Sequence, residues 1–216
     1  MQYAYLDLPR PDILRMIPAL QDSPGNRVLS VGCAYASTEA VLAQQGWEVH
    51  GVDIVPQAID IARTRIASAT LLKPGEPLPW PEASFDGLLL ADVVEHIPQA
   101  ATVLAQWARL VKPGGWIVIS VPNMRQVAVL WEFIFKGDWP ERDTGIFDRT
   151  HLQVMSKKRL ARWCAAADMT IEKWFELYGP NTHRRSKIFR ACDWLTLRLF
   201  HKWWVYQLQV RCRRGQ

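Results

Sequence analysis

The sequence is poor in cysteine and has no long hydrophobic run. Its 216 residues include four cysteines, far apart at positions 33, 164, 192 and 212, with no C-x-x-C pair. This spacing argues against a disulfide framework and a cysteine metal site, and it suits a reducing cytoplasm. No apolar run approaches the roughly 20 residues that span a bilayer, and the N-terminus lacks the charged-then-apolar layout of a secretory signal. We therefore expect a cytoplasmic protein.

Acidic residues are nearly absent from the last part of the chain. Residues 184–216 contain nine Lys or Arg and one acid, Asp193, whereas the whole chain has a formal net charge of +5, which leaves −3 for residues 1–183. A composition of 49% hydrophobic and 22% charged residues supports a packed core, and the length suits one domain. We expect a core over residues 1–183, with residues 184–216 as a basic, aromatic helix and last strand of the same domain.

The sequence also lacks the glycine fingerprint of dinucleotide-binding proteins. Residues 27–53 predict a buried strand, a turn of small residues, a helix and a second strand that ends in Asp53. A G-x-G-x-x-G pattern needs glycines at 32, 34 and 37, where the chain has Gly32, Ala34 and Ser37. A small-residue turn still lets a ligand approach the backbone, and a carboxylate roughly 20 residues later can bind two ribose hydroxyls. The unit indicates an adenosine-containing cofactor and gives less support to a dinucleotide.

Further motifs follow this unit in order along the chain. They read V-L-S-V-G-C-A-Y-A with G-W-E-V-H-G-V-D-I, S-F-D-G-L-L-L-A-D-V-V-E-H-I (84–97), L-V-K-P-G-G-W-I-V-I-S-V-P-N (110–123) and G-I-F-D-R-T-H-L-Q-V-M-S-K-K-R-L (145–160). Together they resemble class I S-adenosylmethionine-dependent methyltransferases over most of residues 25–176, and the last is similar to a bacterial subgroup acting on glycans, lipids or secondary metabolites. The resemblance implies S-adenosyl-L-methionine as cofactor and S-adenosyl-L-homocysteine as product.

The order of elements predicts an α/β fold. Strand and helix patterns alternate, so we expect a Rossmann-like, doubly wound, mainly parallel seven-stranded sheet with helices on both faces; the resemblance implies an antiparallel last strand. We expect helices over 8–20, 56–66 and 99–111, the last one broken by Pro113-Gly114-Gly115 before a strand over 116–121. Residues 123–150 are longer than an ordinary connection and are expected to form a lid or acceptor-binding segment.

The resemblance also implies the cofactor-binding residues. Asp53 would bind the ribose hydroxyls; the alternative is a carboxylate that caps the helix after Pro56. The other implied cofactor contacts come from the turn and from the strand ends: Gly32, Cys33, Ala34, Tyr35, Ile54, Ala91, Asp92 and Val93. The alternatives are a buried apolar role for Cys33 and an ordinary polar turn at Asp92.

Two histidines are candidates for the chemistry. His151 could take a hydroxyl proton near neutral pH, with Asp148 orienting it; alternatively it closes the segment without chemistry. His96, just after the fourth strand, is a second candidate base, although Glu95-His96 could simply begin a helix. None of the five histidines shows metal-ligand spacing with a second ligand, so no metal site is expected.

The sequence favours methyl transfer to a hydroxyl of a small molecule or sugar. A different hypothesis is a binding or scaffold protein that kept the fold and lost the reaction, because Ser30, Ala34 and Ala36 replace an acidic residue and two glycines usual in the family. The missing glycine fingerprint and the absence of a Tyr-x-x-x-Lys pair disfavour a nicotinamide-dependent oxidoreductase.

The basic aromatic tail allows three interpretations. It could be a helix and strand packed on the sheet, a basic amphipathic helix lying on an anionic membrane, or a nucleic-acid-binding face. The first is favoured, peripheral contact with the inner face of a membrane is the main alternative, and nucleic-acid binding is disfavoured. The sequence predicts no oligomeric state.

Overall fold

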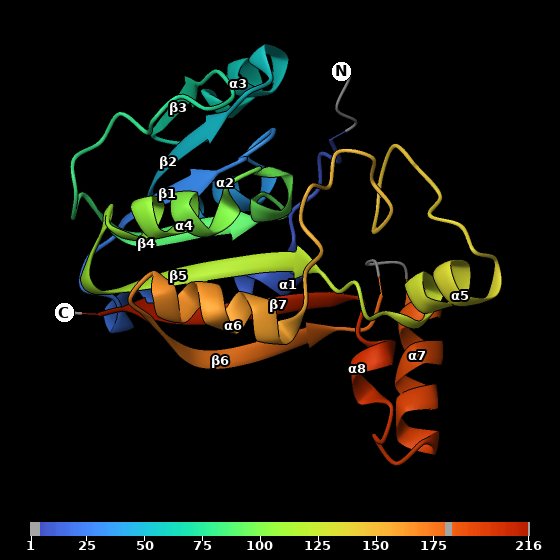
Figure 1. Cartoon of the computed structure of the whole chain (residues 1–216). Helices are drawn as coiled ribbons and strands as arrows, with labels where there is room; N and C mark the ends of the chain where they lie inside the picture. The colour runs from blue at the N-terminus through green and yellow to red at the C-terminus, as the bar shows by residue number, and fades with distance from the viewer. Residues whose placement is uncertain (1–4, 180–182, 216) are drawn as a thin grey trace.

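A seven-stranded sheet runs through the molecule in the order β3-β2-β1-β4-β5-β7-β6 (Figure 1). The computed structural model describes residues 5–179 and 183–215. Its strands are β1 (Arg27–Val31), β2 (Glu48–Asp53), β3 (Ser68–Leu71), β4 (Phe85–Ala91), β5 (Val111–Pro122), β6 (Met169–Leu177) and β7 (Gln207–Arg214). The first five strands in this order are parallel to one another, and β7 is antiparallel to both β5 and β6. The predicted sheet and its antiparallel last strand are confirmed.

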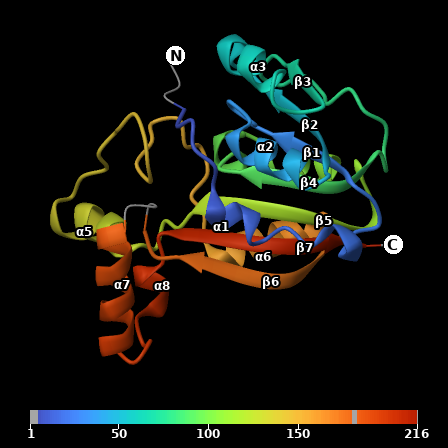
Figure 2. The ribbon, with the colours of Figure 1, turned by 180° about the vertical axis from the view of Figure 1, so that it is seen from behind.

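Helices cover both faces of this sheet. In Figure 1, α4 (Ala100–Ala108) and α6 (Lys157–Ala166) lie in front of the strands, and Figure 2 shows α1 (Pro11–Leu14) and α2 (Ser37–Gln44) on the opposite side, with α3 (Pro56–Ala62) beside β3. Successive strand side chains point to opposite faces. Accordingly, Leu88 and Leu90 of β4 belong to the cluster under α4 and α6, whereas Leu89 packs in the cluster under α1 to α3. The core therefore has two layers divided by the sheet.

The Pro113-Gly114-Gly115 turn lies inside β5, and the prediction that it separates a helix from a strand is wrong. The helix α4 ends at Ala108, and the next residues already pair as a strand, with Val111 opposite Phe85 and Trp116 opposite Gly87. Val111 is fully buried and β-branched, so it favours the sheet over a helix end. The residues between Val111 and Trp116 bulge out of the ladder, where the missing N–H of a proline costs nothing.

The first helix is much shorter than predicted. Instead of a helix over 8–20, the chain forms α1 and then the 3-10 turn η1 (Leu20–Asp22). Pro18 lacks the N–H that would bond to Leu14, and it disfavours helical geometry at Ile17. The periodic apolar residues are nevertheless buried, since Ile13 and Met16 are fully inaccessible to solvent. The next helix is shorter too, because α3 ends at Ala62 and not at residue 66.

The long connection and the tail form helices at the carboxyl end of the parallel strands. α5 (Val127–Phe135) follows β5 within residues 123–150, and α7 (His183–Leu195) and α8 (His201–Trp204) precede β7. Figures 1 and 2 both place α5, α7 and α8 at the end of the sheet to which the arrowheads of β4 and β5 point. The described part of the chain contains no helix with the length and apolarity that a membrane crossing requires.

Candidate active site

In the turn after β1, the backbone of Gly32 is exposed to solvent and two backbone amides are already hydrogen-bonded within the protein. Gly32 has φ +72, and a Cβ atom placed on it would lie 2.6 Å from Val93 Cγ2. Glycine is therefore required here for its positive φ and for the packing of Val93, and we call the exposed backbone of this turn the cradle. Its amides are used internally, since Gly32 N and Cys33 N donate to the carbonyl of Val52 at 2.8 and 3.1 Å. A pyrophosphate needs such amides free, so this turn does not suit a dinucleotide.

The two alanines that replace family glycines keep the glycine-like backbone. Ala34 and Ala36 have φ +47 and +55, a left-handed conformation that costs an L-residue roughly 1–2 kcal/mol. Ala36 is fully buried in the core under α1 to α3. The chain thus preserves the shape of the turn at an energetic cost, and the substitutions do not remove the cradle.

Asp53 lies at the centre of this turn. Its Oδ2 accepts a hydrogen bond from Ala34 N at 2.8 Å, and its Oδ1 accepts from Val55 N and from the Tyr5 hydroxyl, each at 3.0 Å. The helix-cap alternative is wrong, because the N-cap residue of α3 is Val55 and no side chain caps it. Ile54, next to Asp53, is 40% exposed. Asp53 itself is only 4% exposed, so its carboxylate is buried beneath the turn, and the Tyr5 hydroxyl occupies Oδ1.

Tyr35 and Cys33 complete the turn in different ways. The Tyr35 ring is half-buried and meets the Tyr5 ring edge to face at 5.9 Å between centroids. Cys33 is 3% exposed, and burial, with help from the carboxylates of Glu39 and Asp53, raises the pKa of its thiol. A neutral buried thiol fits the apolar alternative for Cys33.

The end of β4 packs directly against the turn. Val93 is the side chain that a Cβ at Gly32 would strike, and Ala91 and Asp92 precede it. Asp92 has φ +58; its Oδ2 accepts from Arg10 Nη1 at 2.8 Å, and its Oδ1 accepts from Gln207 Nε2. These bonds join the start of the chain and β7 to the edge of the site, so Asp92 is more than an ordinary polar turn.

The N-terminal segment lies across this edge of the sheet. Arg10 donates to Asp12 as well as to Asp92. Burial disfavours the charge on Arg10, yet these two carboxylates raise its pKa. Nearer the start, Asp7 pairs with Arg65. Hydrogen bonds from Arg65 and Ser37 lower the pKa of Asp7 to about 2. The segment is fixed by ion pairs above the residues implied for the cofactor.

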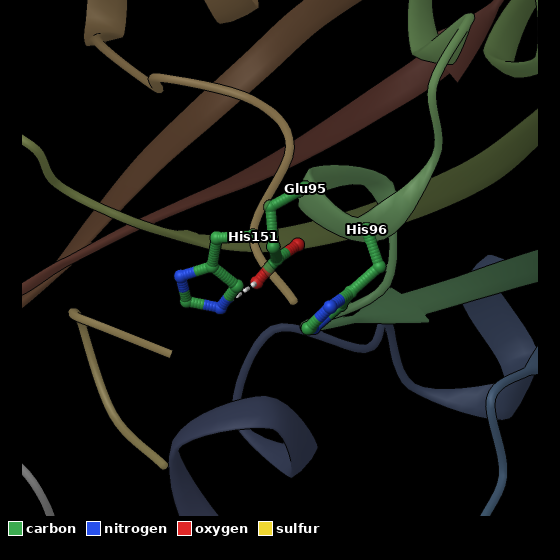
Figure 3. A group of neighbouring side chains, drawn as sticks. All are labelled: Glu95, His96 and His151. Atoms are coloured by element: carbon green, nitrogen blue, oxygen red, sulfur yellow. Dashed lines mark ion pairs between the residues drawn. The ribbon is translucent and has the colours of Figure 1, made fainter. Parts of the chain in front are cut away.

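A cluster of Glu95, His96 and His151 borders the same edge (Figure 3). The short helix η2 (Val94–His96) follows β4 directly, and the carbonyl of Glu95 accepts hydrogen bonds from Leu152 N at 2.8 Å and Gln153 N at 3.1 Å. These bonds bring His151 beside Glu95, with 4.0 Å between Nε2 and Oε1. The two imidazole ring centroids are 4.8 Å apart. Both predicted histidines are therefore brought together at the site.

Asp148 contacts a different partner from the one predicted. Its Oδ1 accepts from the Thr150 hydroxyl at 2.6 Å and from Thr150 N at 2.8 Å. The Thr150 hydroxyl and carbonyl oxygens lie 2.9 and 3.2 Å from His96 Nδ1. Because a carbonyl only accepts, Nδ1 of His96 carries the proton and Nε2 keeps a lone pair. Asp148 thus orients His96 through Thr150, and only its backbone carbonyl bonds to His151 N.

The electrostatics of the cluster follow from burial. Glu95 is fully buried, and neither carboxylate oxygen has a hydrogen-bond partner among the described residues. Burial, reinforced by the negative charge of Asp92, raises the pKa of Glu95 well above its usual value. Burial and the neighbouring His96 lower the pKa of His151. His151 Nδ1 lies 3.3 Å from the carbonyl of Ile146, so its Nε2 is also the unprotonated nitrogen.

The same three side chains form a group that could hold a metal ion. One ligand atom from each of Glu95, His96 and His151 lies within 4.8 Å of the others. Sequence spacing did not indicate this, because His151 is 55 positions after His96 and only the fold brings them together. An imidazole pair with one carboxylate is a donor set that suits zinc and other transition metals.

Several residues of the site were not predicted. Glu95, Thr150 and Arg10 carry its polar contacts; Glu95 and Thr150 stood within quoted motifs without being assigned a role, and Arg10 stood in none. Glu39 lies in the first turn of α2 and was not predicted as a site residue. It is 6% exposed, and its Oε1 accepts from the Ser30 hydroxyl at 2.6 Å. An acid in α2 therefore occupies the space beneath the turn, where the resemblance had suggested a loss at Ser30.

Comparison with known proteins identifies the family. A family model described as a methyltransferase domain matches residues 2–173. The chain is 29% identical over 187 residues to the ubiquinone biosynthesis O-methyltransferase of Paracidovorax citrulli, covering 79% of this chain and 75% of that protein. The chain belongs to the methyltransferase domain family and is a class I S-adenosylmethionine-dependent methyltransferase.

Solved structures share the fold. A SAM-dependent methyltransferase from Archaeoglobus fulgidus superposes with a TM-score of 0.67 at 20% identity, covering 94% of this chain and 91% of that one. The 1,6-didemethyltoxoflavin-N1-methyltransferase of Burkholderia thailandensis, solved with its acceptor and S-adenosylhomocysteine, gives a TM-score of 0.57 at 21% identity over 88% and 71% of the two chains. The predicted class and cofactor are thus confirmed.

Proposed function

We propose that this methyltransferase transfers the methyl group of S-adenosyl-L-methionine to a hydroxyl of a small molecule. The observation that carries the proposal is the chain of contacts from Asp148 through Thr150 to His96, which presents an unprotonated imidazole nitrogen beside the cofactor turn. A base held in one tautomer by a third group is typical of hydroxyl activation. The name of the Paracidovorax relative, an O-methyltransferase, supports the same reaction type.

The residues around the turn fit the cofactor. Gly32 leaves room for close approach, Asp53 would bind the ribose hydroxyls in place of Tyr5, and Cys33, Ala34 and Tyr35 would line its methionine part. Ile54, Ala91, Asp92 and Val93 would border the remainder. The cofactor supplies an electrophilic methyl group when bound; the protein orients the acceptor, excludes water and accepts a proton.

We propose His96 as the base that accepts the hydroxyl proton. Its Nδ1–H is held by Thr150, and no hydrogen bond from the described residues reaches its Nε2. His151 is the second candidate, because its Nε2 faces Glu95 at 4.0 Å and its lowered pKa keeps it neutral at pH 7.

The acceptor and the location are also proposals. Residues 123–150 lie beside the site and would cover it or bind the acceptor, and a sugar hydroxyl is the alternative to another small molecule, as in the glycan- and lipid-modifying subgroup. A cytoplasmic location with contact to the membrane surface is supported by the composition of the tail. The scaffold alternative predicts weak or no cofactor binding, and the family match and the names of the relatives give it no support.

The first experiment is calorimetric titration with S-adenosylmethionine, S-adenosylhomocysteine and NAD, followed by methyl transfer to panels of phenols and sugars. We expect binding of the first two ligands only. Thr150→Val should lower turnover at least about tenfold, part of the roughly 100-fold or larger effect of a general base, and leave cofactor affinity unchanged. Thr150→Ser is the matched control and should restore turnover.

The two histidines are separated by their pH profiles. If His96 is the base, His96→Asn abolishes the acidic limb of the pH–rate profile and His151→Asn retains it. The reverse pattern would assign the base to His151. Equal turnover in Thr150→Val and the parent would refute the chain of contacts from Asp148, and silence in calorimetry would favour the scaffold hypothesis.

A further inference from the structure

A large apolar surface surrounds the end of the sheet where the site lies. Its side chains on α5 and on the α7–α8 segment are all more than one third exposed: Trp131, Phe133, Ile134, Phe135, Ile188, Trp194, Leu195, Leu197, Leu199, Phe200 and Trp203. The most exposed, Leu197, has 81% of its surface open to solvent. Single exposed apolar residues are ordinary, whereas a gathering of this size marks an interaction surface. We call this set the apolar surface.

The apolar surface is attached to the strands that form the site. Asn123, just after β5, donates from Nδ2 to the carbonyl oxygens of Lys202 at 2.9 Å and Val205 at 2.8 Å. This bond pair ties α8 to the end of β5. Both views of the ribbon place α5, α7 and α8 beyond that end of the sheet (Figures 1 and 2), where β4 also delivers Asp92. A body that covers the apolar surface therefore lies at the same end of the sheet as the site.

The charges on the α7–α8 part of the surface are mostly positive, whereas the segment after α5 carries exposed acids at Asp138, Glu141 and Asp143. Residues 183–204 include six Lys or Arg and a single acid, Asp193. Asp193 is 4% exposed; its Oδ2 accepts from the Tyr178 hydroxyl at 2.8 Å and lies 2.7 Å from His201 Nδ1. Its negative charge is thus turned inward. The basic side chains of Lys187, Arg190 and Lys202 are exposed. They lie among apolar residues, against which their aliphatic parts can pack while the charged ends stay in water.

We propose that the apolar surface docks on an anionic lipid bilayer. Tryptophans, other large apolar residues and lysine or arginine on short helices are the composition of interfacial segments that lie in the headgroup region. No described helix crosses a membrane, so the contact is peripheral. A protein partner would have to present acids to the basic side chains of α7 and α8. A second copy of the chain would offer Glu132 of its own α5, and that carboxylate is already paired with Lys136.

Docking has a consequence for the acceptor. It brings the end of the sheet that holds the site toward the lipid, so the methyl acceptor is a hydroxyl compound that resides in the bilayer. This extension rests on the proposed function, whereas lipid docking itself is independent of it. The two parts fail in different experiments.

The test is flotation of the intact protein with vesicles. We expect co-flotation with phosphatidylcholine–phosphatidylglycerol vesicles, little with phosphatidylcholine alone, and weakening with added salt, because each basic side chain near an anionic surface contributes about fivefold in binding. Trp194→Glu combined with Leu199→Glu should reduce vesicle binding more than roughly tenfold, since it removes apolar area and adds repulsion. Both side chains are at least 74% exposed, so the fold tolerates the change.

A matched control introduces two glutamates on a different part of the molecule. Ile61→Glu with Leu71→Glu alters two side chains that are 38% and 43% exposed on α3 and β3, and it should float like the parent. Unchanged flotation of the Trp194–Leu199 variant, or equal binding to neutral vesicles, overturns the proposal. The proposal is also overturned if light scattering shows that the parent is a dimer and the variant a monomer while neither protein floats with vesicles.

Calorimetry on the same proteins separates this proposal from the enzymatic one. Both double variants should bind S-adenosylmethionine like the parent. Cofactor binding without flotation refutes the docking surface alone, and flotation without cofactor binding refutes the proposed function alone.

Discussion

Replacing Asp53 with alanine is expected to weaken cofactor binding about 10- to 150-fold. The carboxylate accepts hydrogen bonds from Ala34 N, Val55 N and the Tyr5 hydroxyl, and a ribose hydroxyl would take the place of Tyr5. A hydrogen bond to a charged group contributes about 1.5–3 kcal/mol, which is about one to two powers of ten in the dissociation constant. The measurement is calorimetric titration of S-adenosylhomocysteine into parent and variant.

The same substitution also removes the acceptor of two backbone amides, Ala34 N and Val55 N. Each amide left without a partner costs about 1–3 kcal/mol, so the free energy of unfolding in urea should fall, and the titration is interpreted only where the variant is folded. Tyr5→Phe is the control, because it removes one donor and keeps the charge of Asp53. It should bind the cofactor as tightly as the parent or up to about tenfold more tightly, since the ribose no longer displaces a hydroxyl. Parent-like affinity in Asp53→Ala would refute the ribose assignment.

Two further predictions concern stability. Because the pKa of Glu95 is raised, the folded protein keeps a proton that the unfolded chain releases, so the free energy of unfolding falls as pH rises above the unfolded pKa, by up to about 1.4 kcal/mol per pH unit from this group. Urea titrations at several pH values should show this fall in the parent and not in Glu95→Gln. Parallel pH dependences of the parent and the variant would contradict a buried neutral carboxyl. Ala34→Gly should raise the free energy of unfolding by about 0.5–1 kcal/mol, because relief of the left-handed conformation exceeds the entropy that glycine adds to the unfolded chain; a destabilised variant would show that φ at this position is not strained.

The periodicity of the sequence was sufficient to predict the sheet, because its central strands are continuous apolar runs. β4 is buried along nearly its whole length, and its short length between turn residues favours a strand over a buried helix. Boundaries near prolines were less predictable. The apolar stripe of residues 8–20 is real, since Ile13 and Met16 are buried, but the backbone follows Pro18 rather than the stripe.

The cofactor side of the site could be predicted from local sequence, and the catalytic side could not. Gly32 and Asp53 belong to one β-α-β unit whose spacing fixes their relation. His96 and Thr150 are 54 positions apart, and their contact depends on backbone bonds from residues 152 and 153 to Glu95. No local pattern encodes that contact. The assignment of Asp148 to His151 rested on sequence proximity, which the turn at Thr150 overrides.

The position of β7 bears on how the protein is made. β7 separates β5 from β6, and its Gln207 and Gln209 side chains donate to Asp92 and Asp12 near the site. During synthesis, β6 leaves the ribosome before β7, so it has no neighbouring strand to pair with until residues 207–214 follow. The nascent chain then exposes the free edge of β5 as well, and two unpaired strand edges favour association with other chains. A released chain truncated before residue 207 should therefore expose both edges and recruit chaperones, whereas the eight residues of β7 close the sheet and complete the polar frame of the site.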